Sequence, residues 1–372
     1  MDAKLFARMF SGSRMNDFKK LLRLYRPEDV EEFSSLLREG FCRTLPILDS
    51  GGNPIFYIEG RARLSASAYR ALLLPYEETV PSVREELEES RATLSLDGII
   101  YGRDATPASD RDEADREERL RGVRRGIEFI GDISRGITVE NIYKLYTIAV
   151  GGPLQHGNYY RHGEPRLRSG VPHSQLPRYM RRLVAFIGSE EGDNDLLKAA
   201  AIHFYMAYLR PYFEGSGIMA RLAQAWYLSR RGYPSALNIP ISGAIARSSR
   251  RYRHATAMTR RNFAICGVTD ITSVLAYFAD NVYNVLPAGG GRSANADIYR
   301  TALEEGRVTE KERDLWDFVR SAYGISDFST KRLEKDFGHA AYATIRGFVM
   351  KFERMKLLSS KKFGNRVRYR VR

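Results

Sequence analysis

The chain has 372 residues, of which 43% are hydrophobic and 11% aromatic, and a formal net charge of +14 at pH 7. This length and apolar content suffice for two or three domains, each with a core of its own. No apolar run is as long as a transmembrane helix requires, and the first residues lack the apolar segment of a signal peptide, so no membrane partner is expected.

The charge and the cysteine count narrow the classes of function further. The net charge of +14 favours an anionic partner, either a nucleotide or a nucleic acid, although it also fits a surface charged for solubility alone. Cys42 and Cys266 are too few for a disulfide framework or a metal cluster. The six histidines show no ligand spacing, so no zinc site is expected. These features favour a cytoplasmic protein with reduced cysteines.

Residues 1–89 are predicted to form an N-terminal helical region with a β-hairpin. Apolar residues recur at three- and four-residue steps between Met15 and Arg38, and Pro27 divides this stretch into two helices. Short apolar runs on both sides of DSGGNP at 49–54 predict the hairpin. The pattern returns to a helix over residues 66–90.

The middle of the chain is predicted to be mainly helical. The charged stretch 103–120 is expected to be an exposed loop, and 150–178, rich in Gly, Pro and His, a loop with short strands. Apolar periodicity predicts helices over 120–133, 139–149, 176–187, 195–209, 218–230, 242–257 and 271–285. The fold class is therefore mainly α.

Two apolar helical runs meet at residues 210–221, which read RPYFEGSGIMAR. Pro211 ends the first run, and a glycine-flanked turn, GSG at 215–217, precedes the second. Free backbone amides at a helix start, together with the helix dipole, form a site for an anion. Glu214 beside the turn is placed to hold a cation that bridges phosphates. By itself, a Gly-x-Gly turn fits an ordinary turn equally well.

This stretch resembles the central motif of Fic-domain (Fido) proteins, a family that mostly transfers AMP from ATP to protein hydroxyls. The motif runs His-Pro-Phe-x-Asp/Glu-Gly-Asn-Gly-Arg-x-x-Arg. With Tyr212 standing for Phe, the matching positions are Pro211, Glu214, Gly215, Gly217 and Arg221. Three positions depart from it: Arg210 stands at the catalytic histidine, Ser216 at the asparagine and Ile218 at the first arginine.

The resemblance covers residues 90–286 and implies a Fic-type helical bundle with a small β-hairpin flap. It implies binding of a nucleotide or phosphate ligand by Arg210, Gly215, Ser216, Gly217 and Arg221, with ATP or another nucleotide carrying Mg²⁺ to Glu214. No catalytic residue is expected, because arginine stays protonated near neutral pH and Arg210 cannot accept the proton of a hydroxyl group.

The stretch near residues 91–98 resembles the inhibitory helix of Fic proteins, whose pattern is Ser/Thr-x-x-x-Glu followed by Gly or Asn. Thr93, Asp97 and Gly98 fit this pattern, with Asp in place of Glu. In the family this acid pairs with the last arginine of the motif and excludes the γ-phosphate, so the resemblance implies a pair between Asp97 and Arg221. The same residues also fit a helix that merely ends at a glycine.

Residues near 150–175 correspond to the flap, a hairpin that aligns the target segment of Fic proteins by main-chain pairing. Tyr159, Tyr160 and Arg161 resemble the Gly-x-Tyr-Arg entry to that flap, with one residue extra. A protein target paired at a sheet edge needs no particular side chains, so its identity is not predicted. A plain surface loop fits these residues as well.

Two further side chains are candidates for the site. His203 precedes Arg210 by seven residues, roughly 10 Å along a helix, which is too far for a replacement base and favours a structural role. Tyr252 follows a basic stretch, as a tyrosine of Fic domains often does, and either packs against a base or belongs to the core.

Residues 287–294, PAGGGRSA, are predicted to be a linker, and 295–372 a separate winged helix-turn-helix domain. Three helices, over 310–323, 331–337 and 340–355, precede two strands around 363–365. From residue 341 onward there are ten Lys or Arg and one acid, which favours duplex DNA as partner. The residues expected on its phosphates are Lys361, Lys362, Arg366, Arg368 and Arg370. A protein–protein module of the same fold is the alternative.

Three functions are therefore open. The first is a catalytically impaired adenylyltransferase, a pseudoenzyme that binds a nucleotide or other phosphate ligand and couples it to the C-terminal module. The second is an active protein adenylyltransferase with altered chemistry. The third is a DNA-binding transcriptional regulator in which the Fic-like part is a scaffold. A homodimer is a further candidate assembly.

Overall fold

The computed structural model describes residues 1–12, 17–73, 83–98, 110–151, 159–164, 171–190, 194–286, 298–299, 301–303, 305–323, 327–363 and 366–371. Contacts divide the chain into two compact units. The first holds the described residues of Met1–Leu73, Ser90–Leu237 and Ile241–Ala288, and the second those of Leu74–Glu89, Asn238–Pro240 and Gly289–Arg372. The domain boundaries predicted from the sequence stay a prediction.

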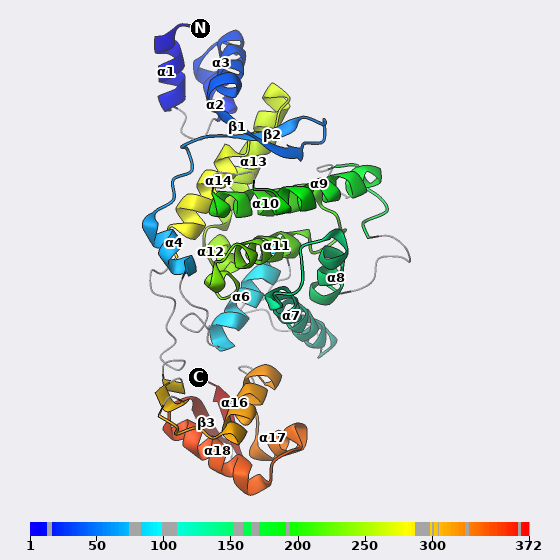
Figure 1. The fold of residues 1–372 in the computed structure, drawn as a ribbon, viewed down its shortest axis with the longest axis vertical. Helices are drawn as coiled ribbons and strands as arrows, with labels where there is room; N and C mark the ends of the chain where they lie inside the picture. Colours follow the sequence, from blue (N-terminus) through cyan, green and yellow to red (C-terminus); the bar gives the residue numbers. More distant parts are fainter. Residues whose placement is uncertain are drawn as a thin grey trace. The chain divides into compact units, whose positions relative to one another are not determined.

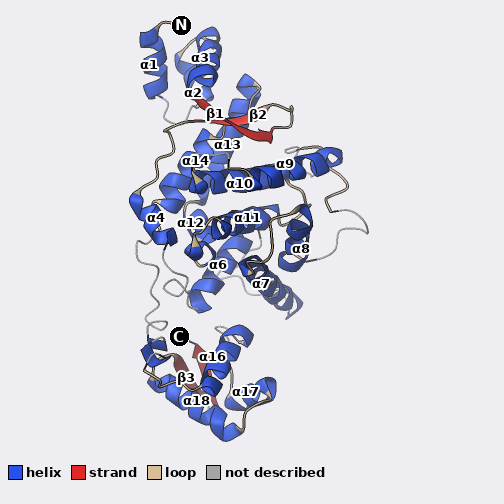
Figure 2. Ribbon diagram, viewed as in Figure 1, coloured by secondary structure: helices blue, strands red, loops and turns tan. Residues whose placement is uncertain are grey.

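The first unit is almost entirely helical, and two short strands form the sheet seen within its described residues (Figure 2). The mainly α class predicted from the sequence is confirmed. The elements of the N-terminal part are α1 (Ala3–Gly12), α2 (Phe18–Leu24), α3 (Pro27–Gly40), β1 (Cys42–Leu48), β2 (Pro54–Ile58) and α4 (Ala66–Leu73). The later elements are α6 (Val83–Leu96, of which Ser90–Leu96 belongs to this unit), α7 (Asp110–Gly131), α8 (Val139–Ala149), η1 (His173–Gln175), α9 (Leu176–Gly188), α10 (Asp195–Leu209), α11 (Ser216–Arg230), η2 (Pro234–Leu237), α12 (Ile241–Arg247), α13 (Ser249–Cys266), α14 (Thr272–Phe278) and η3 (Ala279–Tyr283).

The antiparallel pair α10 and α11 is the centre of this unit. Both helices are rich in alanine and large apolar residues and are buried along most of their length. In Figure 1, α13 and α14 lie on one side of the pair and α6 and α7 on the other. Because α10 ends at Leu209 and α11 begins at Ser216, the connection between them is short.

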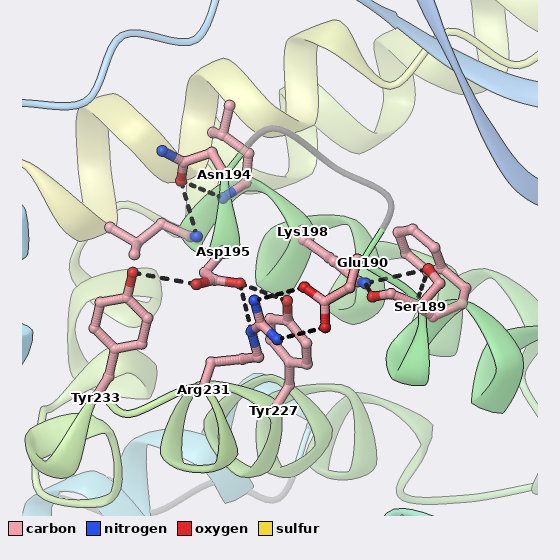
Figure 3. Close-up of polar contacts among 11 residues, drawn as sticks. Ser189, Glu190, Asn194, Asp195, Lys198, Tyr227, Arg231 and Tyr233 are labelled. Atoms are coloured by element: carbon pink, nitrogen blue, oxygen red, sulfur yellow. Dashed lines mark hydrogen bonds and ion pairs between the residues drawn. The ribbon is translucent and has the colours of Figure 1, made fainter.

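A network of hydrogen bonds holds α10 against α11 at the end of the pair that is far from their connection (Figure 3). The side chain of Asn194 accepts the backbone N–H groups of Leu196 and Leu197 and so caps α10. The carboxylate of Asp195 accepts the hydroxyl of Tyr227 at 2.8 Å and the guanidinium of Arg231 at 2.9 Å, both from α11. These bonds fix how far α10 slides along α11, and therefore the geometry of the connection at the other end.

The N-terminal helices and the hairpin pack as an outer layer on this bundle. α2 and α3 are separated at Pro27 as predicted, and their apolar faces meet in a small core with Met9, Phe33 and Ile58. β1 and β2 are antiparallel, with Cys42 opposite Ile58. The turn between them is closed by Asp49, whose carboxylate accepts two backbone N–H groups, at Gly51 and Asn53.

The expectation of an exposed loop over 103–120 is wrong from residue 110 onward. Asp110–Gly131 is a single helix, α7. Its first half holds few apolar residues, but carboxylates and guanidinium groups alternate along it and pair, as in Arg119 with Asp115 and Arg125 with Glu118. Gly122 and Gly126 then allow α7 to pack closely on α8, because a Cβ at either glycine would meet atoms of Ala149 at under 3 Å. Residues 103–109 lie outside the described residues.

The second unit has its own apolar core. Its regular elements are α16 (Glu310–Ala322), α17 (Thr330–Phe337), α18 (Tyr342–Arg354), β3 (Leu358–Phe363) and β4 (Arg366–Val371). Thr309 and Glu312 form a reciprocal capping box at the start of α16. Phe328, between α16 and α17, exchanges two backbone hydrogen bonds with Tyr369 of β4 and so adds a third chain segment to the hairpin. This order of elements is the one that the winged-helix prediction requires, and that assignment stays a prediction.

Within the described residues, none of the helices combines the length and the apolar character needed to cross a bilayer.

His203 lies in the core of the first unit rather than at the site. Its side chain is fully buried in α10, and its two ring nitrogens are 2.8 Å from Oε1 of Gln224 and 3.0 Å from the hydroxyl of Tyr252. Burial, together with the charge of Arg221, lowers the pKa of His203 from 6.5 to about 3. With both nitrogens engaged and the ring kept neutral, this residue ties α10 to α11 and α13.

The buried His203 makes the first unit sensitive to acid. The unfolded chain takes up a proton on this ring below about pH 6.5, whereas the folded chain does not until about pH 3, so the free energy of unfolding falls as the pH drops through this window. Between pH 6.5 and 5, the wild type should lose about 2 kcal/mol more than His203→Gln, measured by urea unfolding. His254→Gln, at an exposed histidine, should follow the wild type. Equal losses in wild type and His203→Gln would rule this out.

Candidate functional site

The connection between α10 and α11 creates a helix start with free amides. Gly215 is the N-cap of α11, with φ of 71°, and its carbonyl accepts the first helical hydrogen bond, from Met219. A Cβ at Gly215 would lie 2.6 Å from a methyl of Val150, so both the conformation and the space require glycine here. The expectation that residues 215–217 stand at the start of a helix is met, and the helix begins at Ser216 rather than 218.

A buried arginine holds this connection in shape. The guanidinium of Arg161 donates to the carbonyls of Arg210, Gly163 and Val171, and the backbone N–H of Arg161 donates to the carbonyl of Pro211. Burial lowers the pKa of Arg161, against the opposing effect of Glu164 nearby. One side chain thus satisfies carbonyls from three chain segments and ties the flap entry to the end of α10.

Arg210 ends α10 in a left-handed conformation, with φ of 47° and ψ of 60°. Such a conformation is uncommon for a residue with a side chain. It turns the chain sharply out of α10, so that Arg210 lines a cavity of about 810 Å³ together with Glu214, Gly215, Ser216 and Gly217. The structure therefore brings these predicted site residues together.

Residues at the C-terminal end of α6, Thr93 and Asp97, also contribute to this site. The guanidinium of Arg221 donates to Oδ1 of Asp97 at 2.8 Å and to the carbonyl of Thr93 at 2.8 Å, and its Nε donates to the hydroxyl of Thr93. Asp97 and Arg221 are both largely shielded from solvent, with side-chain exposures of 13% and 6%. The predicted pair is thus in contact, and Gly98, with φ of 87°, ends the helix directly after it.

The carboxylate of Asp97 also lies against the start of α11. Its Oδ2 accepts the backbone N–H of Ile218 at 3.4 Å. A Cβ at Gly217 would lie 2.2 Å from its Oδ1, so only glycine leaves room for the carboxylate there. A negative group therefore already sits at the positive end of the helix, where a phosphate would bind. We call this arrangement of Asp97 with Arg221, Ile218 N–H and Gly217 the carboxylate lock.

Two of the positions that depart from the Fic pattern carry neither a guanidinium nor an amide side chain. The side chain of Ile218 is buried, with 2% exposure, and carries no charge toward the cavity. The hydroxyl of Ser216 donates to the carbonyl of Tyr212 at 3.1 Å, within its own loop. Tyr212, at the phenylalanine position, is buried and stacked on Tyr146 with ring centroids 3.7 Å apart, so it serves packing.

Three charged residues of the cavity wall were not predicted from the sequence. Asp115, Arg116 and Arg119 come from the first half of α7, which was expected to be a loop. The i, i+4 spacing of Asp115 and Arg119 was the available signal, since it favours a helix. With Arg210, these residues give the cavity three guanidinium groups in addition to the Arg221 of the lock.

A smaller cavity of about 440 Å³ lies between α10 and α13. Its walls are mainly aromatic and hydroxylic, and Ala207 and Arg210 line both cavities. The lining residues that matter here are Phe204, Tyr208, Tyr252, Thr256, Thr259 and Phe263. Tyr252 is half-buried and bonded to His203, so it contributes to the core and to the cavity wall together.

Glu214 is the residue predicted to hold a metal ion at this site. Among the described residues there is no cluster of three or more His, Cys, Asp or Glu side chains suited to a metal. Glu214 is exposed to the larger cavity. Mg²⁺ commonly keeps several waters and binds one or two carboxylates together with substrate phosphates. Glu214 therefore fits a magnesium ion that arrives with a nucleotide.

The flap is described only in part. Tyr159, Tyr160 and Arg161 precede a bend, and no strand occurs in 159–164 or 171–175. Residues 152–158 and 165–170, where the hairpin was predicted, lie outside the described residues. Tyr159 is 44% exposed and contacts Tyr143, with ring centroids 4.9 Å apart.

The cations predicted for duplex binding divide between two faces of the β3–β4 hairpin. Lys361 lies directly opposite Arg368, and Arg370 follows on the same face, whereas Lys362 lies opposite Val367 on the other face. Arg370 is already paired with Asp327 at 2.8 Å. The side chain of Arg366 lies outside what the structure describes.

Comparison with known proteins places this site in a family. The model of the Fic/DOC family matches residues 136–228. A crystal structure of a Fic family protein from Desulfovibrio desulfuricans G20 is similar at 15% identity over 78% of this chain and 87% of that chain, with a TM-score of 0.43. The family match confirms the resemblance for residues 136–228, a Fic/DOC domain that holds α8 to α11 and the connection at 210–215.

Proposed function

We propose that the Fic/DOC domain of this chain binds a nucleotide or a related phosphate ligand, has lost efficient adenylyl transfer, and couples ligand binding to the C-terminal unit. The observation that carries the proposal is the carboxylate lock: Asp97 occupies the amide and the guanidinium that an incoming phosphate needs. A site that had lost all anion binding would have no need of an anion held in this position.

The larger cavity suits a phosphate chain. The amides at the start of α11 and the guanidinium groups of Arg210, Arg116 and Arg119 face it from three elements. Arginine binds phosphate through two parallel hydrogen bonds, and a partly enclosed site strengthens each of them. The smaller cavity, which shares Ala207 and Arg210 with the larger one, is the proposed place for the base, with Tyr252 and Tyr208 on its walls. Mg²⁺ would enter with the phosphates and be held by Glu214.

The chemistry of transfer is impaired at a defined step. A hydroxyl nucleophile needs a base, and the loss of a positioned base costs roughly 10²–10⁴-fold in rate. Arg210 stands where the motif has histidine and cannot accept a proton. His203 cannot replace it, because the ring is buried and both of its nitrogens are engaged. Ile218 removes a second group that would bind phosphate. Binding without turnover is therefore expected.

Removing the lock should tighten ligand binding. Because Asp97 competes with phosphate for Arg221 and the α11 amides, Asp97→Ala should lower the Kd for ATP with magnesium by about tenfold or more, which corresponds to about 1.4 kcal/mol. The measurement is calorimetry with ATP, ADP and AMP, with and without magnesium. Glu214→Ala should remove the part of the affinity that depends on magnesium.

Asp115→Ala is the matched control for this experiment. It removes a carboxylate from the same cavity wall but leaves Arg221 and the start of α11 untouched, so it should change the Kd far less. The absence of binding by Asp97→Ala at millimolar nucleotide would contradict the proposal. Transfer of label from ATP to protein by the wild type, lost in Glu214→Ala, would instead favour the active adenylyltransferase.

A second function, duplex DNA binding by the C-terminal unit, is favoured by one feature of its hairpin. Like charges directly opposite each other destabilise an antiparallel pair, yet Lys361 faces Arg368 across β3 and β4. A polyanion bound along this face would offset the repulsion.

Charge reversal at this pair tests the second function. Lys361→Glu with Arg368→Glu should weaken binding of a labelled duplex at least tenfold at low salt, because two attractive interactions with phosphates become repulsive. Lys311→Glu with Arg313→Glu, on the exposed face of α16, is the control of equal charge and should have a much smaller effect. Equal losses for the two pairs would count against the hairpin as the binding face.

A further inference from the structure

Helix α13 carries a pattern of arginines that the proposed nucleotide site, apart from Arg260, does not use. Its 18 residues, SRRYRHATAMTRRNFAIC, contain five arginines and one histidine and neither lysine, aspartate nor glutamate. The buried residues of this helix are Ala255, Met258, Thr259 and Asn262. The arginines are therefore not among the side chains that pack this helix against the rest of the unit.

These charges gather on the solvent side of the helix. At about 100° per residue, Arg250, Arg253, His254, Arg260 and Arg261 fall within an arc of roughly 120°, opposite the buried face. Arg250, Arg253, His254 and Arg260 are exposed. Ala257 and Ala264 lie in the same arc and leave it flat. We call the face formed by Arg250, Arg253, His254, Arg260 and Arg261 the arginine face; from Arg250 to Arg261 it is roughly 16 Å long.

The N-terminal end of the arginine face is unfavourable for the helix that carries it. Arg250 lies in the first turn, where the helix dipole repels a positive charge and no acidic residue compensates it. The N-cap Ser248 does not cap the helix with its side chain, because its hydroxyl is engaged with the carbonyl of Ala244 and the hydroxyl of Tyr277. Arg250, Arg253 and Arg260 form no ion pair or hydrogen bond through their side chains with any part of the chain that the structure describes.

An external anion would offset the charge of this face, and the side chains on the face indicate which kind of anion fits best. A protein interface usually needs an apolar or aromatic anchor at its centre, and a membrane-surface helix needs a face of large apolar residues. The arginine face has only alanines where a protein interface or a membrane-surface helix would need large apolar side chains. A nucleic-acid backbone requires no such anchor, and repeating phosphates suit arginine forks along a line. We propose that the arginine face of α13 binds the phosphate backbone of a nucleic acid.

The arginine face is separate from the hairpin of the second unit, and it meets the proposed nucleotide site at Arg260 alone. Arg260 also lines the smaller cavity, so the backbone would pass close to its rim. The lock residues Asp97 and Arg221 do not belong to the face. Binding to the face is therefore expected whether or not the cavities bind a nucleotide.

The test uses the full chain with the hairpin charges reversed (Lys361→Glu, Arg368→Glu), so that binding by the second unit does not mask the result. Into this background Arg250→Glu and Arg253→Glu are introduced together. Fluorescence anisotropy with labelled duplex DNA, single-stranded DNA and RNA should show a Kd raised at least tenfold near 0.1 M salt. The slope of log K against log salt should fall by about two, close to one for each phosphate that the variant no longer neutralises.

The control is Arg178→Glu with Arg181→Glu in the same background. These arginines have the same i, i+3 spacing, are exposed, and begin in the first turn of α9, so the change in charge and in the helix dipole is matched. The control should raise the Kd less than threefold. Because Arg250→Glu relieves a charge opposed to the dipole, the α13 variant should melt no lower than the control, which separates lost binding from lost folding.

Three results would overturn the proposal: equal losses in the two variants, no loss in either, or no binding of any of the three nucleic acids by the background chain. Binding of phosphatidylserine vesicles that depends on Arg250 and Arg253, without nucleic-acid binding, would assign the face to an anionic membrane instead. Retention of binding in Arg250→Lys with Arg253→Lys would support an interaction that depends mainly on charge.

Discussion

The contact between the carboxylate of Asp97 and the start of α11 is the constraint on which the candidate site depends. It joins three features that the bundle would otherwise leave exposed: a helix N-terminus, a nearly buried guanidinium and the end of α6. A buried charge without a partner is costly, and removal of one member of a buried pair typically costs about 3–5 kcal/mol. Asp97 thus neutralises both Arg221 and the start of α11, and an anionic ligand at this site would compete with its carboxylate.

Other contacts in the first unit fix the positions of the groups that Asp97 contacts. Asp195, Tyr227 and Arg231 fix α10 against α11 at one end of the pair. At the other end, Arg161 fixes the carbonyls of the connection, and Gly215 allows Val150 to approach the start of α11. His203 ties both helices to α13. Because these contacts are buried and specific, the backbone amide of Ile218 and the guanidinium of Arg221 are held in fixed positions. The carboxylate of Asp97 contacts both groups, and a phosphate bound there would do the same.

Much of this arrangement was predictable from local signals. The helices around 195–209 and 218–230, the break at Pro211 and the Gly215–Gly217 turn follow from apolar periodicity and from the backbone preferences of proline and glycine. The contact between Asp97 and Arg221, 124 residues apart, was expected through the family resemblance alone, because no periodicity relates two helices so distant in sequence. The first half of α7 is stabilised by ion pairs rather than by an apolar stripe, so apolar periodicity does not predict a helix there. Arg161 binds three carbonyls from separate segments, so no pattern in the sequence around it predicts this role.

Hydrogen–deuterium exchange on addition of ATP and magnesium tests the competition directly, because the lock and the ligand would use the same groups. The account predicts that amides of residues 90–98 exchange faster as Asp97 is displaced, while amides in the first turn of α11 exchange more slowly. Nucleotide bound at saturation with residues 90–98 unchanged would contradict it, since the ligand would then bind without displacing the carboxylate.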